Sequence, residues 1–303
     1  MRPISEQRRL VEQEGRKHSV LRGRWKQFHF ENMPKLQRAF GCFLQVLHLK
    51  GLGQRNTLEV QLKDLEFEFS DLPPAFDDYR ILFISDMHID GMDALTNRIT
   101  ELIDSSDYDL CILGGDYTFS YGWKEGLDHS NLKRIVQKLI AKTRVVGILG
   151  NHDVYAVAEL LDGMGVEILI NDNTLIEKGQ DNIHIAGIDD SHYFGSDDLS
   201  QATSGIEGES FKILAAHSPE SLNKASHLGY NLYLTGHTHG GQVCLPGGTQ
   251  IVRGASMPRK FLKGCWQCGK MSGYTTTGAG TSGLDVRFFC KPEIAMITLK
   301  RAR

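Results

Sequence analysis

Hydrophobic positions in the middle of the chain fall into short aliphatic runs, and polar residues follow each run at once. The runs occupy residues 81–84, 110–113, 145–149, 213–215 and 232–234. Runs of this length without polar interruption predict strands that are buried on both faces. Ligands bind open α/β sheets at the carboxyl ends of the strands, so we expect the polar residues after the runs to converge on one site.

The spacing of apolar residues changes along the chain. Residues 57–70 alternate between apolar and polar, which predicts a half-buried strand. From residue 79 onward strands alternate with helices, which we predict over residues 93–104, 131–142 and 154–163. Beyond Val166 we expect short strands over residues 183–188, 211–215, 231–234, 242–245, 273–277 and 294–299. This order predicts two sheets packed face to face with helices outside, an α/β sandwich.

Aspartate, asparagine and histidine follow the five aliphatic runs. The motifs are Asp86-Met87-His88, Gly115-Asp116, Gly150-Asn151-His152-Asp153, Ala216-His217-Ser218 and Gly236-His237-Thr238-His239. Each motif alone has an ordinary structural explanation, such as an aspartate that caps the next helix. Together they supply the ligand types and the number of ligands that two adjacent divalent metal ions need, which predicts a binuclear metallohydrolase.

The five motifs in this order resemble the signature of the calcineurin-like metallophosphoesterase superfamily, D-x-H, G-D, G-N-H-D/E, H and G-H-x-H, over residues 80–299. The resemblance implies a four-layer α/β/β/α sandwich. It also implies that Asp116 bridges two metal ions. One ion would be completed by Asp86, His88 and His239, and the other by Asn151, His217 and His237. We expect Mn²⁺ first, although mixed oxygen and nitrogen ligands without cysteine also suit iron and zinc.

The resemblance further implies a catalytic role for His152, which matches the family's histidine that binds no metal. Its imidazole would donate a proton to the leaving oxygen or stabilise charge on the phosphoryl group. We expect Asp153 to orient this imidazole and to raise its pKa. Weaker candidates for substrate contact are Tyr117 and His192 near the motifs, and the cationic residues Arg253, Arg259, Lys260, Lys263 and Arg287.

Metal ligands determine the reaction class, whereas loops outside the motifs select the substrate. Residues 236–242 and 281–287 resemble a bacterial subgroup that includes YkuE-like and YaeI-like phosphodiesterases and the alternative UDP-2,3-diacylglucosamine hydrolase. This implies a phosphodiesterase or pyrophosphatase for a lipid- or nucleotide-linked phosphoester. The alternatives are a soluble nucleotide phosphodiesterase or broad-specificity phosphatase, and, from another class, a non-catalytic scaffold. The full set of motif residues argues against the scaffold.

Charge divides the chain into a basic N-terminal arm, residues 1–55, and an acidic catalytic domain, residues 56–303. Residues 1–50 hold eleven Lys or Arg against four Glu, a net of +7, and the whole chain carries −3, so the remainder carries −10. A basic segment favours an anionic partner. The apolar residues between 34 and 50 favour a membrane surface as that partner, and we expect no nucleic acid.

Two interpretations remain open for the predicted helix over residues 34–50: it lies in a membrane interface, or it packs against the catalytic domain. It is too short and too charged to span a bilayer. Arg8-Arg9 is not followed by an apolar stretch, and the six cysteines have irregular spacing. We therefore expect a cytoplasmic protein, and the first interpretation of the helix would place it peripherally at the inner face of the membrane.

Overall fold

The structure, a computed structural model, describes residues 3–13, 21–22, 27–28, 34–90, 92–118, 129–252 and 254–302. A first sheet has six strands in the order β3-β14-β4-β5-β6-β7. They span Gln61–Phe69 (β3), Glu293–Arg301 (β14), Tyr79–Ile84 (β4), Leu110–Leu113 (β5), Arg144–Gly147 (β6) and Glu167–Ile168 (β7). Neighbours are parallel except β14 and β4. Three of the aliphatic runs therefore lie side by side in β4, β5 and β6.

A second sheet has the order β12-β13-β11-β10-β9-β8. Its strands span Gly264–Cys268 (β12), Met271–Thr275 (β13), Leu232–Thr235 (β11), Lys212–Ala215 (β10), Asp181–Gly187 (β9) and Asp172–Lys178 (β8). The inner four are parallel, and the edge strands β12 and β8 are antiparallel to their neighbours. The two edge strands were not predicted.

The predicted strand over residues 242–245 was wrong. Val243 and Cys244 make only isolated bridges, to Phe288 and Gln250. Gly240, Gly241 and Gln242 all have positive φ, which turns the chain out of the extended conformation.

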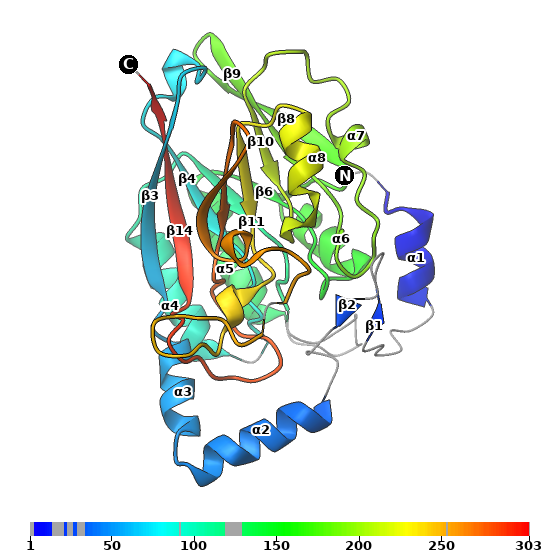
Figure 1. The fold of residues 1–303 in the computed structure, drawn as a ribbon. Helices are drawn as coiled ribbons and strands as arrows, with labels where there is room; N and C mark the ends of the chain where they lie inside the picture. The colour runs from blue at the N-terminus through cyan, green and yellow to red at the C-terminus, as the bar shows by residue number, and fades with distance from the viewer. Residues whose placement is uncertain are drawn as a thin grey trace.

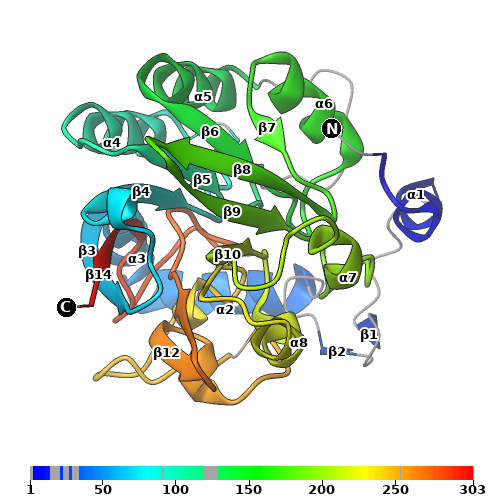
Figure 2. The same ribbon diagram turned by 90° about the horizontal axis from the view of Figure 1, so that it is seen from above.

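The two sheets pack face to face, and helices cover both outer faces (Figure 2). Along β4, Ile81 and Phe83 point into the core between the sheets, whereas Leu82 and Ile84 point toward the helices. This explains why the run is apolar at every position. The predicted four-layer α/β/β/α sandwich is confirmed.

The helices over the first sheet agree with the predicted spacing. They are α4 (Asp93–Asp104), α5 (Ser130–Lys142) and α6 (Tyr155–Gly163), and each buries one apolar stripe. The second sheet is covered by α7 (Leu199–Ala202) and α8 (Leu222–His227). Short 3₁₀ turns lie at Pro74–Phe76 (η2), Pro219–Ser221 (η3), His239–Gly241 (η4) and Arg259–Phe261 (η5).

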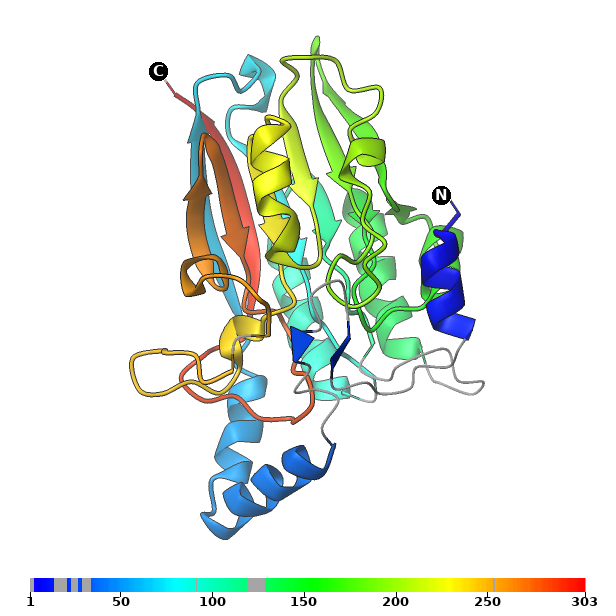
Figure 3. The ribbon, with the colours of Figure 1, turned by 45° about the vertical axis from the view of Figure 1, so that its right-hand side comes forward.

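The N-terminal region contains α1 (Glu6–Gln13), the paired strands β1 (Leu21–Arg22) and β2 (Gln27–Phe28), α2 (Pro34–Val46) and α3 (Lys50–Thr57). Figures 1 and 3 show α2 and α3 next to the end of the sandwich where β4, β5 and β6 finish. Among the described residues, no helix combines the length and apolar character needed to cross a membrane.

The predicted single helix over residues 34–50 was wrong at its end. The chain turns at His48, which has φ 55°, and continues as α3. This second helix crosses the predicted domain boundary at residue 55, and the predicted strand over residues 57–70 begins only at Gln61. Gly53 of α3 packs so tightly that a Cβ there would lie 2.7 Å from Val286 Cβ, so a tertiary contact stabilises a helix with weak local preference.

Candidate metal centre

Seven candidate ligands lie in loops at the carboxyl ends of five central strands. From the first sheet, Asp86 and His88 follow β4, Asp116 follows β5, and Asn151 follows β6. From the second sheet, His217 follows β10, and His237 and His239 follow β11. None of the seven exceeds 9% exposure. The two sheets therefore present their polar ends to one buried site, as the aliphatic runs predicted.

Two motif glycines allow backbone to approach the carboxylates. A Cβ at Gly150 would lie 2.2 Å from Asp116 Oδ1, and a Cβ at Gly236 would lie 2.2 Å from Asp86 Oδ2. Any side chain at either position would displace a carboxylate. This explains why glycine begins both the Gly-Asn-His-Asp and the Gly-His-Thr-His motifs.

Five of the ligand residues have the left-handed backbone conformation that non-glycine residues rarely adopt. Their φ values are 54° at Asp86, 43° at His88, 54° at Asp116, 66° at His237 and 49° at His239. Such strain costs on the order of 1–3 kcal/mol per residue and persists where the surrounding fold imposes it, which is common at functional sites.

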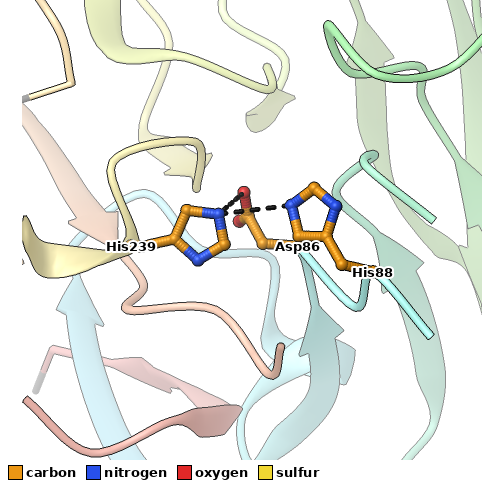
Figure 4. A group of neighbouring side chains, drawn as sticks. All are labelled: Asp86, His88 and His239. Atoms are coloured by element: carbon orange, nitrogen blue, oxygen red, sulfur yellow. Dashed lines mark hydrogen bonds and ion pairs between the residues drawn. The ribbon is translucent and has the colours of Figure 1, made fainter. Parts of the chain in front are cut away.

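One group of ligand atoms is formed by Asp86, His88 and His239 (Figure 4). His239 Nε2 lies 3.5 Å from Asp86 Oδ1 and 3.2 Å from His88 Nε2. Figure 4 shows the two imidazoles directed toward one another beside the carboxylate. One carboxylate oxygen and two imidazole nitrogens form a donor set that suits a divalent transition metal.

A second group surrounds Asn151. Its Oδ1 lies 2.8 Å from His237 Nδ1 and 3.1 Å from His217 Nε2. Asp116 Oδ2 lies 3.3 Å from His217 Nε2 and 3.5 Å from His88 Nε2, so this carboxylate stands between the two groups. The arrangement brings together all seven residues that were expected to bind metal.

The charges of this cluster are strongly coupled. Although burial alone would raise the pKa of Asp116, the imidazoles of His217 and His152 hold it well below its usual range. Burial alone would lower the pKa of His217, but Asp116 and Asp86 raise it well above normal. Because histidine binds metal through an unprotonated nitrogen, the raised pKa of His217 means that a cation competes with a proton for this ring.

The remaining ring nitrogens contact groups that orient the imidazoles. His88 Nδ1 lies 3.2 Å from Thr118 O, and His217 Nδ1 lies 2.8 Å from Gly114 O. Donation from Nδ1 to a carbonyl leaves the Nε2 lone pair for a metal. At His239, burial, His88 and the Arg287 guanidinium hold the pKa well below normal, so this ring stays neutral, the state in which histidine binds metal.

His152 lies at the same centre. Its backbone N–H donates to Asp116 Oδ1 at 2.7 Å, and its Nε2 lies 3.9 Å from Asp116 Oδ2. The imidazole packs edge-on against His88, with ring centroids 4.7 Å apart. His152 also lines the pocket described below. It is therefore close enough to the ligand cluster to act on a molecule bound there.

The carboxylate of Asp153, which we expect to orient the His152 imidazole, also holds three backbone groups. It accepts the N–H groups of Asp116 at 2.7 Å, Tyr117 at 3.0 Å and Gly150 at 2.8 Å. Burial, together with the Asp116 charge, raises the pKa of Asp153 to about 6. Asp153 thus joins the two loops that carry Asp116 and His152.

Comparison with known proteins agrees with this geometry. The sequence model of the calcineurin-like phosphoesterase family matches residues 79–241. The chain belongs to this family. It is 30% identical to the metallophosphoesterase YkuE of Bacillus subtilis, over 82% of this chain and 90% of the relative. It is 24% identical to the metallophosphoesterase YkoQ of the same organism, over 80% and 91%. It is 27% identical to the phosphodiesterase YaeI of Escherichia coli, over 73% and 82%.

The protein is therefore a metal-dependent phosphoester hydrolase. The donor set fits this assignment, because buried oxygen and nitrogen atoms within 4.8 Å of one another form three overlapping groups around Asp116 and His88. The scaffold alternative is not supported.

Two of the residues predicted to contact the substrate, Tyr117 and Arg287, are fully buried. Tyr117 is fully buried and donates its hydroxyl to Ile148 O at 2.7 Å, so it belongs to the core. Arg287 is also fully buried, and its guanidinium donates to backbone carbonyls including Thr277 O at 2.7 Å and Gly278 O at 3.2 Å. It supports the loops behind His239 instead of facing a ligand. Arg253 lies outside the described residues.

His192 is likewise buried, with 1% exposure. Its ring packs 4.1 Å from that of His237, and its Nδ1 lies 2.7 Å from Glu220 Oε1. Although burial alone would raise it, the His192 imidazole lowers the pKa of Glu220 to about 2. The phosphoesterase thus uses His192 and Glu220 to support a candidate ligand. Sequence reasoning missed Glu220, because no motif spacing connects it to His192.

A pocket of about 290 Å³ opens onto the metal centre. Its polar end contains Asp116, Asn151, His152, His237 and His239. Its remaining wall is largely apolar and is formed by Leu36 and Phe40 of α2 with Val243, Ile251, Val252 and Leu284. The centre is therefore accessible from one side, along a wall that belongs partly to the N-terminal region.

Proposed function

We propose that this protein is a binuclear metal-dependent phosphodiesterase or pyrophosphatase for a lipid-linked phosphoester, such as UDP-2,3-diacylglucosamine. The apolar wall next to the candidate metal centre carries this proposal. A pocket that receives only a small phosphate or a nucleotide has little use for Leu36, Phe40 and Leu284 beside the reacting group. An acyl chain attached near the phosphorus would bury its methylenes there, each contributing about 0.8 kcal/mol.

The wall continues along α2 away from the pocket. Leu36, Phe40, Phe43 and Leu47 recur at helical spacing and form one stripe. Phe40 and Phe43 stack with ring centroids 6.4 Å apart. Phe43 and Leu47 are 55% and 47% exposed. An apolar chain that leaves the pocket would therefore meet further apolar surface.

The neighbouring side of α2 packs on the catalytic domain. Leu44 is buried, and a Cβ at Gly41 would be in ordinary contact with Leu284 Cδ2, at 3.6 Å. The helix is thus held beside the pocket while its apolar stripe stays open. This supports both earlier interpretations of the segment at once: one side packs, and the other is available to lipid.

The chemistry follows from the residues around Asp116. When bound, two divalent cations lower the pKa of a water molecule and neutralise charge on the phosphoryl oxygens. Asp116 would share its carboxylate between the two ligand groups, and its short distances to His217 and His88 support this role. His152 would donate a proton to the oxygen that leaves phosphorus as water adds, and its position 3.9 Å from Asp116 Oδ2 supports this role. Asp153 keeps the backbones of these two loops in register.

An anionic membrane surface is the proposed partner of residues 1–50. The net charge of +7 in this segment supports it, as do the exposed Phe43 and Val46 of α2 and the exposed Leu47 just after the helix. Further exposed apolar residues, Leu245, Ile251 and Phe289, lie on loops that adjoin the pocket wall. Each basic residue near an anionic surface contributes about 1 kcal/mol. Contact with the membrane would bring the pocket mouth to a lipid substrate.

A substrate panel tests the proposed function. Turnover of UDP-2,3-diacylglucosamine, a phospholipid, a small soluble diester and a monoester is compared with added Mn²⁺, Fe²⁺ or Zn²⁺. We expect the highest kcat/KM on a diester or pyrophosphate that carries acyl chains. Equal or higher kcat/KM on soluble nucleotide diesters would favour a soluble nucleotide phosphodiesterase. Preference for the monoester would favour a phosphatase.

A further inference from the structure

Two arginines are completely buried in the described part of the chain, and both lie near the candidate metal centre. Arg287 supports the loop of His239, as described above. Arg8 belongs to α1, far outside the matched family region, and also has 0% exposure. A buried guanidinium is unfavourable unless each of its donors is satisfied, so its contacts indicate what the fold gains from it.

All three nitrogens of the Arg8 side chain are used. Nη1 donates to Asp189 Oδ1, Nη2 donates to the backbone oxygen of Asp153 at 2.6 Å, and Nε donates to Glu12 Oε1 at 2.9 Å. The guanidinium also lies over the Phe194 ring, 4.2 Å from its centroid. Only a planar fork with several fixed donors can make these contacts together.

The Asp153 and Asp189 contacts join two loops that both reach the metal centre. Asp153 directly follows Asn151 and His152, and its carboxylate holds the Asp116 loop. Asp189 begins the loop in which Asp190 accepts the N–H groups of Tyr193 and Phe194, and this loop presents His192 to His237. Arg8 therefore connects the loop after β6 with the loop after β9.

Neighbouring residues of α1 fix the helix in this place. Glu12 accepts the N–H of Tyr155, the first residue of α6, with Oε1 at 3.2 Å and Oε2 at 3.3 Å. A carboxylate is favourable there because the first N–H groups of a helix have no partner within it. Gln7 Nε2 donates to the backbone oxygen of Phe194 at 2.7 Å. The helix thus contacts both segments that Arg8 connects, at Tyr155 and at Phe194.

We infer that α1 is a clamp on the catalytic site and that Arg8 is a positioning residue for His152. By holding the backbone of Asp153, the guanidinium limits how far the preceding imidazole can move relative to Asp116. The inference rests on the proposed function for its kinetic readout, because it assumes that His152 takes part in turnover. It assigns to the basic N-terminal arm a role inside the enzyme, separate from contact with a membrane.

Full-length Arg8→Gln tests the clamp, with Arg9→Gln as the matched control. Arg9 is the next residue of the same helix and is exposed, so its variant removes the same charge without removing the buried contacts. Arg8→Gln should keep its metal content and KM on a small soluble diester and lose about 10- to 100-fold in kcat, the scale of a misplaced catalytic group. Arg9→Gln should match the wild type.

A double variant separates positioning from general weakening of the fold. In a His152→Ala background, Arg8→Gln should cause little further loss of kcat, because no imidazole remains to be positioned. If the two losses multiply instead, Arg8 acts independently of His152, and the inference is wrong.

Hydrogen exchange supplies a readout that needs no turnover. Backbone amides of residues 150–155 and 189–194 should exchange faster in Arg8→Gln than in the wild type or Arg9→Gln.

This experiment separates the clamp from the proposed function. A wild type without metal-dependent turnover would contradict the proposed function alone, since exchange still reports on the clamp. If Arg8→Gln does not fold, Arg8→Lys is used in its place. Lysine keeps the positive charge beside Asp189, but its single nitrogen cannot also donate to the backbone oxygen of Asp153. Unchanged exchange in the folded variant would overturn the clamp.

Discussion

The metal centre and the pocket wall meet in one cavity but are built in opposite ways. The centre consists of buried polar side chains that follow parallel strands, and its residues lie almost entirely within the matched family region 79–241. The wall consists of apolar residues from α2 and from the loops around Ile251 and Leu284, which lie outside that region. The proposed function assigns the two parts different roles: the centre carries out the reaction, and the wall would select the substrate.

The largest expected effect comes from breaking the centre at the residue shared by both ligand groups. Asp116→Asn should abolish hydrolysis of every substrate and lower the metal content, because a neutral amide cannot neutralise two cations. Dialysis of the wild type against a chelator should also abolish hydrolysis, and added Mn²⁺ should restore the activity. Elemental analysis and turnover measure both, with the exposed Asp107→Asn as the control. Normal turnover with two metals per chain in Asp116→Asn would contradict the shared ligand.

The second effect separates chemistry from metal binding within the centre. His152→Ala should keep its metals and lose about 10²–10⁴-fold in kcat, the usual contribution of a general acid. The loss should be smaller for an activated aryl ester than for an alkyl ester, since a good leaving group needs little protonation. His227→Ala, on an exposed histidine, is the control. Equal losses on both esters would indicate stabilisation of phosphoryl charge instead.

The third effect should appear at the wall and only for substrates with an apolar group. Combined Leu36→Ala and Phe40→Ala should lower kcat/KM on an acyl-bearing diester about tenfold, which corresponds to about 1.4 kcal/mol of lost apolar contact. A small soluble diester should be cleaved at nearly the wild-type rate. Val46→Ala on the same helix is the control, since Val46 is 76% exposed. A parallel loss on both diesters would remove the distinction between wall and centre.

The smallest effect on hydrolysis is expected beyond the pocket, on the exposed apolar residues at the end of α2 and just after it. Phe43→Asp with Leu47→Asp should abolish the salt-resistant part of binding to anionic vesicles and leave cleavage of a soluble diester intact. Binding of the wild type should weaken with salt, because screening acts beyond about 10 Å at 0.1 M. Co-sedimentation with anionic vesicles measures the binding. Wild-type protein that stays in the supernatant at low salt would assign α2 to packing alone.

Sequence patterns predicted the parts of the molecule that depend on local order. The runs in β4, β5 and β6 are apolar on both faces because layers cover both faces, so their burial was visible as uninterrupted hydrophobicity. The seven candidate ligands were visible because each must follow a strand end. The bonds from Asp153 to the backbone of Asp116, Tyr117 and Gly150 were not predicted, since a motif names a side chain without showing which backbone groups surround it.

The amino-acid sequence by itself determined the sandwich, the order of the ligands and the class of reaction, because strand burial and metal ligation require particular residue types at particular positions. Only the tertiary structure decided that Leu36 and Phe40 form a wall beside the centre, that Glu220 pairs with His192, and that Arg8 joins two catalytic loops. The Arg8–Asp189 contact, for example, connects residues 181 positions apart. Such contacts depend on how separate elements pack, and no local pattern in the sequence records that packing.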